Sequence, residues 1–104
     1  MKSLTTIRMD FARAKQQASE LEDIAKRLRA LANGDLTDSL QTLSAAWKGD
    51  SANAYQDKGA QLKSKITASA KNLESIAATI RSVAKRTYDA EMRAYYLVKN
   101  RTHS

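Results

Sequence analysis

The sequence predicts an all-α protein: an antiparallel helix–turn–helix hairpin that dimerises into an elongated four-helix bundle. Two observations support this prediction. The 104 residues include no proline and only three glycines, which favours long helices over a sheet with several turns. Apolar side chains also recur at steps of three and four residues on both sides of one central bend. The length corresponds to a single domain.

The first helix is expected over residues 4–46. Its apolar positions keep a heptad spacing for about four repeats: Leu4, Ile7, Phe11, Ala14, Ala18, Leu21, Ala25, Leu28 and Ala32. Ile24 and Leu31 widen this stripe, so the helix should bury a second flank. The series then resumes with Leu36, Leu40, Leu43 and Trp47.

The segment Asn33-Gly34-Asp35 interrupts the pattern of the first helix. Glycine costs about 1 kcal/mol relative to alanine inside a helix, and this triplet is compatible with a turn. The apolar series nevertheless resumes at once, so we expect one helix that is locally unwound or bent near Gly34. The alternative is a true break, after which Asp35 or Thr37 caps a new helix.

The bend is expected at residues 47–50, which include the single tryptophan, Trp47. Gly49 is free to take a positive φ, which helices use to end. Asp50 or Ser51 can then accept a backbone N–H and start the second helix.

The second helix is expected over residues 51–98, followed by a flexible tail over 99–104. Its apolar series alternates steps of three and four: Ala52, Tyr55, Gly59, Leu62, Ile66, Ser69, Leu73, Ile76, Ile80, Val83, Thr87, Ala90, Ala94 and Leu97. A short bend pairs positions whose numbers sum to 94 or 95, which places Leu36 against Gly59. Residues 95–104 then project beyond the first helix, either as a docking segment or as a frayed end.

Two helices bury little core for a chain of this length, so the apolar stripes need a cover from a second hairpin. The residues expected in the hairpin and dimer core are Phe11, Leu21, Ile24, Leu28, Leu31, Leu40, Leu43, Leu62, Ile66, Leu73, Ile76 and Ile80.

The residue types argue against chemistry in this chain. There is no cysteine and one histidine, His103, so we expect no metal site, no cofactor and no catalytic residue. No apolar run approaches the ~18 residues of a membrane span, and the first residues lack the apolar core of a signal peptide. The net charge of +7 is compatible with an acidic protein, nucleic acid or an anionic membrane as partner. The basic residues form no compact block, so nucleic acid is not favoured.

The central Trp47-Lys48-Gly49 triplet between two long amphipathic helices resembles the WXG family, the early-secreted-antigen-like substrates of type VII secretion. The resemblance covers nearly the whole chain and includes Leu40, Leu43 and Trp47, followed by Ala54-Tyr55. It implies a hairpin that forms a four-helix bundle and is exported without a cleaved signal peptide, by a membrane machine with a cytoplasmic ATPase.

The resemblance also implies an export signal, in which the bend of one protomer lies near a C-terminal Tyr-x-x-x-Asp/Glu element of its partner. Trp47 and Gly49 match the first half, and Trp47 would lie partly exposed at that cleft or close the hairpin core. The second half departs from the pattern, because Met92, Lys99 and Asn100 follow Tyr88, Tyr95 and Tyr96 at the acidic position, and Glu91 is three residues after Tyr88. Two interpretations remain open within the secretion system: a homodimeric secreted substrate, or a heterodimer partner or targeting chaperone of a toxin or second small helical protein. A third, less favoured interpretation is a nucleic-acid-binding or membrane-active helical protein.

Overall fold

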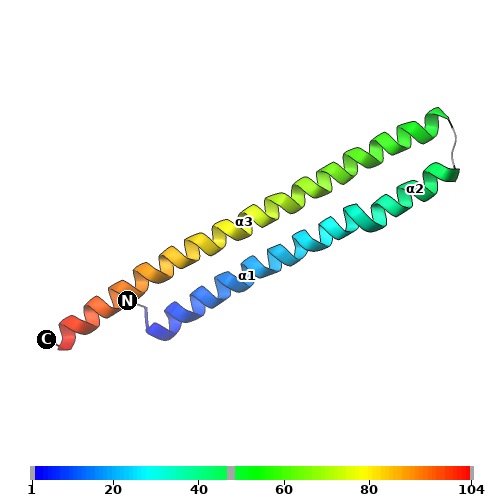
Figure 1. Ribbon diagram of the computed structural model, residues 1–104. Coiled ribbons are helices and arrows are strands. Elements are labelled where there is room, and N and C mark those ends of the chain that lie inside the picture. The colour runs from blue at the N-terminus through cyan, green and yellow to red at the C-terminus, as the bar shows by residue number, and fades with distance from the viewer. Residues whose placement is uncertain (1, 47–48, 104) are drawn as a thin grey trace. The chain divides into compact units, whose positions relative to one another are not determined.

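The computed structural model describes residues 2–46 and 49–103, and within these ranges it contains helices and no strand. Helix α1 comprises Leu4–Ala30, a π-helical turn η1 comprises Leu31–Asp35, α2 comprises Leu36–Ala46, and α3 comprises Asp50–His103 (Figure 1). The all-α prediction is therefore confirmed. Ser3 caps α1, since its hydroxyl oxygen accepts the Thr6 N–H at 3.1 Å.

The chain forms two compact units, each built from antiparallel helical segments. The terminal unit contains Met1–Leu21 and Ser75–Ser104, and the bend unit contains Glu22–Glu74. In the terminal unit, Arg81 donates to the Ser19 hydroxyl at 2.9 Å. In the bend unit, Arg29 Nη2 lies 2.5 Å from Glu74 Oε1, and this guanidinium lowers the pKa of the Glu74 carboxyl. The predicted antiparallel helix–turn–helix hairpin is confirmed.

The buried seam between the helices consists mainly of alanine. Among the described residues, the buried apolar side chains are those of Ile7, Ala18, Ala25, Ala32, Ala52, Ala70 and Ala77. Short side chains at facing positions allow two helix axes to approach closely. The larger apolar side chains lie to the sides of this seam, where Leu21, Leu28, Leu40, Leu43, Ile66, Leu73 and Ile80 are half-buried.

The register expected from the sequence is wrong by about one helical turn. A methyl group added at Gly59 would overlap the side chain of Leu40, whereas Leu36 was expected at that position. Phe11 stacks on Tyr88 in the terminal unit, and Leu40 lies against Gly59 in the bend unit. The residue numbers of facing positions therefore sum to 99 in both units. The physical reason is the composition of α3. Alanines such as Ala70 and Ala77 allow the first helix to approach α3 more closely than the adjacent residues at positions 69 and 76 would.

The interruption at Asn33-Gly34-Asp35 is a π-helical turn within a continuous helical path. Ala30 and Leu36 both keep right-handed helical dihedrals, and the Leu36 N–H bonds to the Leu31 carbonyl, an i→i+5 bond. The Thr37 hydroxyl donates to the Ala32 carbonyl at 2.8 Å and so does not cap a new helix. The expectation of local unwinding is confirmed. The π-helical turn holds one more residue than an α-helical turn. Apolar residues four positions apart around Ala32 and Leu36 therefore stay on the same face of the helix.

The bend uses the conformational freedom of Gly49, which has a φ of 80°. Its carbonyl accepts the N–H groups of Ala52 and Asn53 at 3.2 and 3.3 Å, so Gly49 itself occupies the N-cap position expected for Asp50 or Ser51. Helix α3 continues to His103 rather than ending at residue 98. The reason is that no proline or glycine follows Gly59 to stop it.

Two glycines give opposite predictions when replaced by alanine. Gly59→Ala should lower the free energy of unfolding by about 1–2 kcal/mol, because the overlap with Leu40 outweighs the gain in helix propensity. Gly34→Ala is the matched control, because nothing lies within 4 Å of its added methyl group and stability should not fall. Urea unfolding checks both. Equal stability of Gly59→Ala and wild type would contradict the Leu40 contact, and Leu40→Ala should abolish the penalty.

Candidate partner-binding surface

Helix α3 carries a second apolar seam that the hairpin does not cover. Its members recur at multiples of seven residues and are Leu62, Ile76, Val83 and Leu97, with exposed fractions of 48, 49, 46 and 59%. Ser69 and Ala90 occupy the intermediate positions of this spacing. We call these six residues the outer seam. A seven-residue apolar repeat is the pattern by which one helix packs against another.

The first helix also exposes large apolar side chains in the bend unit. Ile24 and Leu31, seven residues apart, are 42 and 43% exposed. The sequence prediction that this stripe is too wide for one partner helix therefore agrees with their exposure in the single chain. The assignment of Ile24, Leu31, Leu62 and Ile76 to a dimer core stays a prediction.

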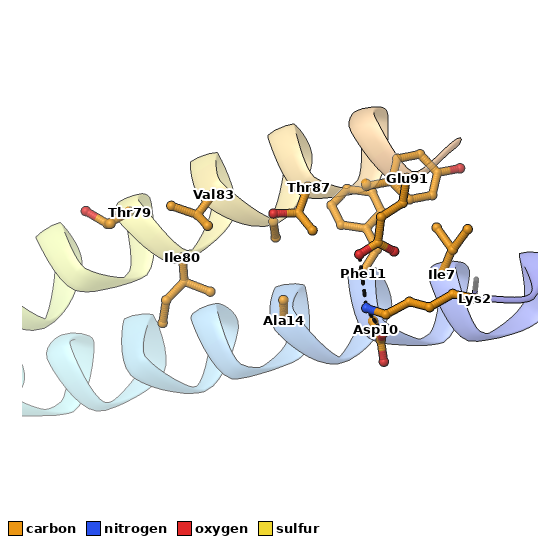
Figure 2. A pocket seen from close by; sticks show the side chains of 12 residues that line it. Lys2, Ile7, Asp10, Phe11, Ala14, Thr79, Ile80, Val83, Thr87 and Glu91 are labelled. Atoms are coloured by element: carbon orange, nitrogen blue, oxygen red, sulfur yellow. Dashed lines mark hydrogen bonds and ion pairs between the residues drawn. The ribbon is translucent and has the colours of Figure 1, made fainter. Parts of the chain in front are cut away.

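A groove of about 370 Å³ lies in the terminal unit, between the start of α1 and the later part of α3 (Figure 2). Its walls are mostly apolar, and the charged atoms come from three residues, Lys2, Asp10 and Glu91. The other lining residues are Ile7, Phe11, Ala14, Thr79, Ile80, Val83, Ala84, Thr87 and Tyr88. Val83 lines the groove and also belongs to the outer seam.

An aromatic stack forms one wall of the groove. The ring centroids of Phe11 and Tyr88 are 4.5 Å apart with an interplanar angle of 23°. The Lys15 ammonium lies 4.5 Å from the Phe11 centroid, within range of a cation–π interaction. Tyr88, which the resemblance proposed for the export signal, therefore packs inside the hairpin.

Lys2 joins the two helices at the charged end of the groove. Its Nζ lies 3.0 Å from both Asp10 Oδ2 and Glu91 Oε1, and Figure 2 shows the side chain of Lys2 extending toward both carboxylates. The hydrogen bonds to Glu91 and then Asp10 raise the pKa of Lys2 above its ordinary value of 10.5. Because the Lys2 ammonium is exposed, its pairing with the two carboxylates contributes only weakly to the stability of the fold.

The Lys2 contact predicts a pH dependence of known sign. Because the folded pKa is raised, the contact stabilises the fold below pH 10.5 and is lost as the pH rises through the raised pKa. We expect Lys2→Met to melt slightly below wild type at neutral pH and to converge with it once the pH exceeds the raised pKa of Lys2. Circular dichroism melting of the two proteins measures this difference. A constant difference at all pH values would contradict the assignment.

The net charge resides almost entirely in the terminal unit. That unit holds ten basic and four acidic side chains, a net +6, whereas the bend unit holds eight and seven, a net +1. Three of the four acids of the terminal unit already contact lysine: Asp10 and Glu91 contact Lys2, and Asp89 lies 3.0 Å from Lys85. The terminal unit is therefore strongly basic.

The last turns of α3 expose aromatic and apolar side chains. Tyr95 is half-buried, whereas Tyr96 and Val98 are each 46% exposed, and Tyr95 and Tyr96 meet edge to face at 5.4 Å. Met92, Arg93, Tyr96, Leu97 and Asn100 line a shallow second hollow there. This segment is helical, and its role as a docking segment stays a prediction.

The structure brings some of the predicted site residues together. Tyr88 and Glu91 both line the groove, Tyr95 and Tyr96 follow them on α3, and Gly49 has the expected positive φ. Trp47 lies outside the described residues. Sequence reasoning missed Lys2, and no periodic signal marks it. It also missed the Phe11–Tyr88 stack, because the predicted register places Phe11 against position 83 or 84 instead.

The described residues show few features of other functional classes. They contain no group of three or more His, Cys, Asp or Glu side chains placed to hold a metal ion. None of the described helices combines the length and apolar character that crossing a bilayer requires.

Comparison with known proteins identifies one family. The family model WXG100, proteins of 100 residues with WXG, matches residues 6–92 of the chain. No curated protein and no solved structure that was compared with the chain matches it. The matched range includes every lining residue of the groove except Lys2 and every residue of the outer seam except Leu97.

Proposed function

The chain belongs to the WXG100 family, a family associated with type VII secretion, and from this premise we propose that it works in such a system as one half of a dimer of hairpins. It is exported by the secretion machine, or acts as a component that the machine needs. Its partners in this role are a second copy or a related helical hairpin, and the secretion ATPase.

One observation carries this proposal: the outer seam, whose large apolar side chains are about half exposed in the single chain. In the terminal unit, exposed apolar side chains at Ile76, Val83 and Leu97 are costly in water and are typical of a surface that pairs with another helix. A partner hairpin on this surface would complete a four-helix bundle.

The export signal in this proposal combines the bend with a C-terminal element of the partner. Trp47 and Gly49 supply the bend. Tyr88 and Glu91 are already engaged by Phe11 and Lys2, so a partner has easier access to Tyr96, which is exposed, than to these two residues.

A second candidate function is favoured by the charge distribution. A protein with a net +6 on one unit is suited to an acidic companion, which would make the chain a heterodimer partner or targeting chaperone of a toxin or second helical protein.

Export from the producing bacterium tests the proposal. We expect the chain in the culture medium of cells with an intact type VII ATPase, and only inside cells in which that ATPase is inactivated. A cytoplasmic marker protein controls for lysis. Equal amounts of the chain in both media, with the marker absent, would contradict a role as a substrate of this machine.

A further inference from the structure

We propose that the outer seam of the terminal unit binds an acidic amphipathic helix of another protein rather than a second copy of this chain. This inference rests on the proposed function for the helical nature of the partner. It goes further in assigning the surface and the side chains that select an acidic partner over a second copy.

The first step is the composition of the seam. Counting in sevens, one set of positions in the terminal unit is Ile76, Val83, Ala90 and Leu97, and the set three residues later is Thr79, Arg86, Arg93 and Asn100. These eight side chains lie along one strip of α3, because residues three and four apart are neighbours on a helix. The strip combines large apolar groups at positions 76, 83 and 97 with two arginines, Arg86 and Arg93, and contains no carboxylate.

The second step is that neither arginine of the strip pairs with a carboxylate in the described part of the chain. The ion pairs within the described part of the chain include neither Arg86 nor Arg93, and Arg93 donates only to the backbone carbonyl of Asp89. The carboxylates nearest in sequence, Asp89 and Glu91, contact Lys85 and Lys2 instead. A partner that covers the apolar positions would desolvate both guanidinium groups, and it must supply acceptors for them.

The third step excludes a second copy. Pairing two terminal units through this strip would bring two surfaces of net +6 together and place arginine against arginine. Like charges across an interface cost several kcal/mol. The bend unit of a second copy has a net charge of +1 and so offers no net negative charge in return. An acidic helix removes both penalties.

The fourth step separates a helix from other anionic partners. A membrane-surface helix presents an apolar face at least ~100° wide, whereas the outer seam has one apolar position in seven flanked by arginine. Nucleic-acid binding draws mainly on phosphate contacts, to which a row of apolar side chains such as Ile76, Val83 and Leu97 contributes nothing. Apolar positions repeating every seven residues, beside a groove of about 370 Å³, fit the apolar side chains of a partner helix.

Binding of two matched peptides to the full-length chain tests the proposal. Both are labelled 28-residue helices with leucine at heptad positions a and d, one with glutamate and one with lysine at e and g. We expect the glutamate peptide to bind at least about tenfold tighter in fluorescence anisotropy, and the preference to shrink with salt. The double variant Arg86→Glu/Arg93→Glu should prefer the lysine peptide. Lys26→Glu/Lys71→Glu, the same charge change in the bend unit, should leave the preference intact.

Several outcomes would overturn the inference. One is equal affinity for the two peptides. Another is a dimer of the chain alone that Val83→Glu dissociates, because a second copy would then cover the strip. Binding of a 30-base-pair DNA duplex, or of phosphatidylglycerol vesicles, that requires Arg86 and Arg93 would assign the strip to those partners instead. Circular dichroism confirms that each variant is folded.

The two proposals fail separately. Export that depends on the ATPase, together with a homodimer through Val83, would retain the proposed function and remove the acidic partner. Selective binding of the glutamate peptide, with no export, would retain the acidic helix site and remove the secretion role.

Discussion

Replacing Phe11 by alanine is expected to lower the free energy of unfolding by about 2–4 kcal/mol, the largest effect of any single truncation in the terminal unit. Phe11 is the only phenylalanine of the chain, and its ring stacks on Tyr88 at a centroid distance of 4.5 Å. Phe11 also lines the groove beside Ile7, Ile80 and Val83, so its truncation would enlarge a space that is already open. Truncation would also remove the platform beneath the Lys15 ammonium.

Urea unfolding followed by circular dichroism measures this effect. Met9→Ala is the matched control, because Met9 is a large apolar residue of the same helix that is 54% exposed, and its truncation should cost less than about 0.5 kcal/mol. Phe11→Leu should recover part of the loss by refilling the volume. Equal stabilities of Phe11→Ala and Met9→Ala would show that the stack does not hold the terminal unit together.

Replacing Trp47 by alanine is expected to reduce export strongly while leaving the hairpin folded. An interface tryptophan that acts as a hot spot contributes about 2 kcal/mol or more, which corresponds to roughly a thirtyfold loss of recognition. The hairpin contacts described above, including Leu40 on Gly59 and Phe11 on Tyr88, do not involve residue 47.

The measurement compares the amount of the variant in the culture medium with its melting temperature after purification. Trp47→Phe is the conservative control and should export better than Trp47→Ala. A large drop in melting temperature, accompanied by an equal loss of dimer, would assign Trp47 to the hairpin core instead of the export signal.

The helical hairpin could be predicted from the sequence because its signals are local and agree with one another. The three-and-four spacing, the missing prolines and the positive φ available to Gly49 all specify long helices around one bend. The unwinding near Gly34 was equally visible, since a run of four-residue steps cannot stay on one face of a regular α-helix.

The register could not be predicted in the same way, because α3 offers two adjacent seams. Positions 62, 69, 76 and 83 are the more hydrophobic choice, and periodicity alone assigns them to the hairpin. The structure instead buries Ala70 and Ala77 one residue later, which allows closer helix contact. The larger side chains are thereby left on the outside, where a partner can use them. The Lys2 contacts depend on this register and so were not visible either.

The central claim, that another helical hairpin covers the outer seam, is tested most directly by photo-crosslinking in the producing cell. A photoreactive amino acid replaces Val83 in one strain and Ser82 in another, since adjacent helix positions point about 100° apart. We expect a crosslinked complex from position 83, containing a second small helical protein, and none from position 82. Equal crosslinking at both positions, or none at position 83 while the chain is still exported, would contradict the account.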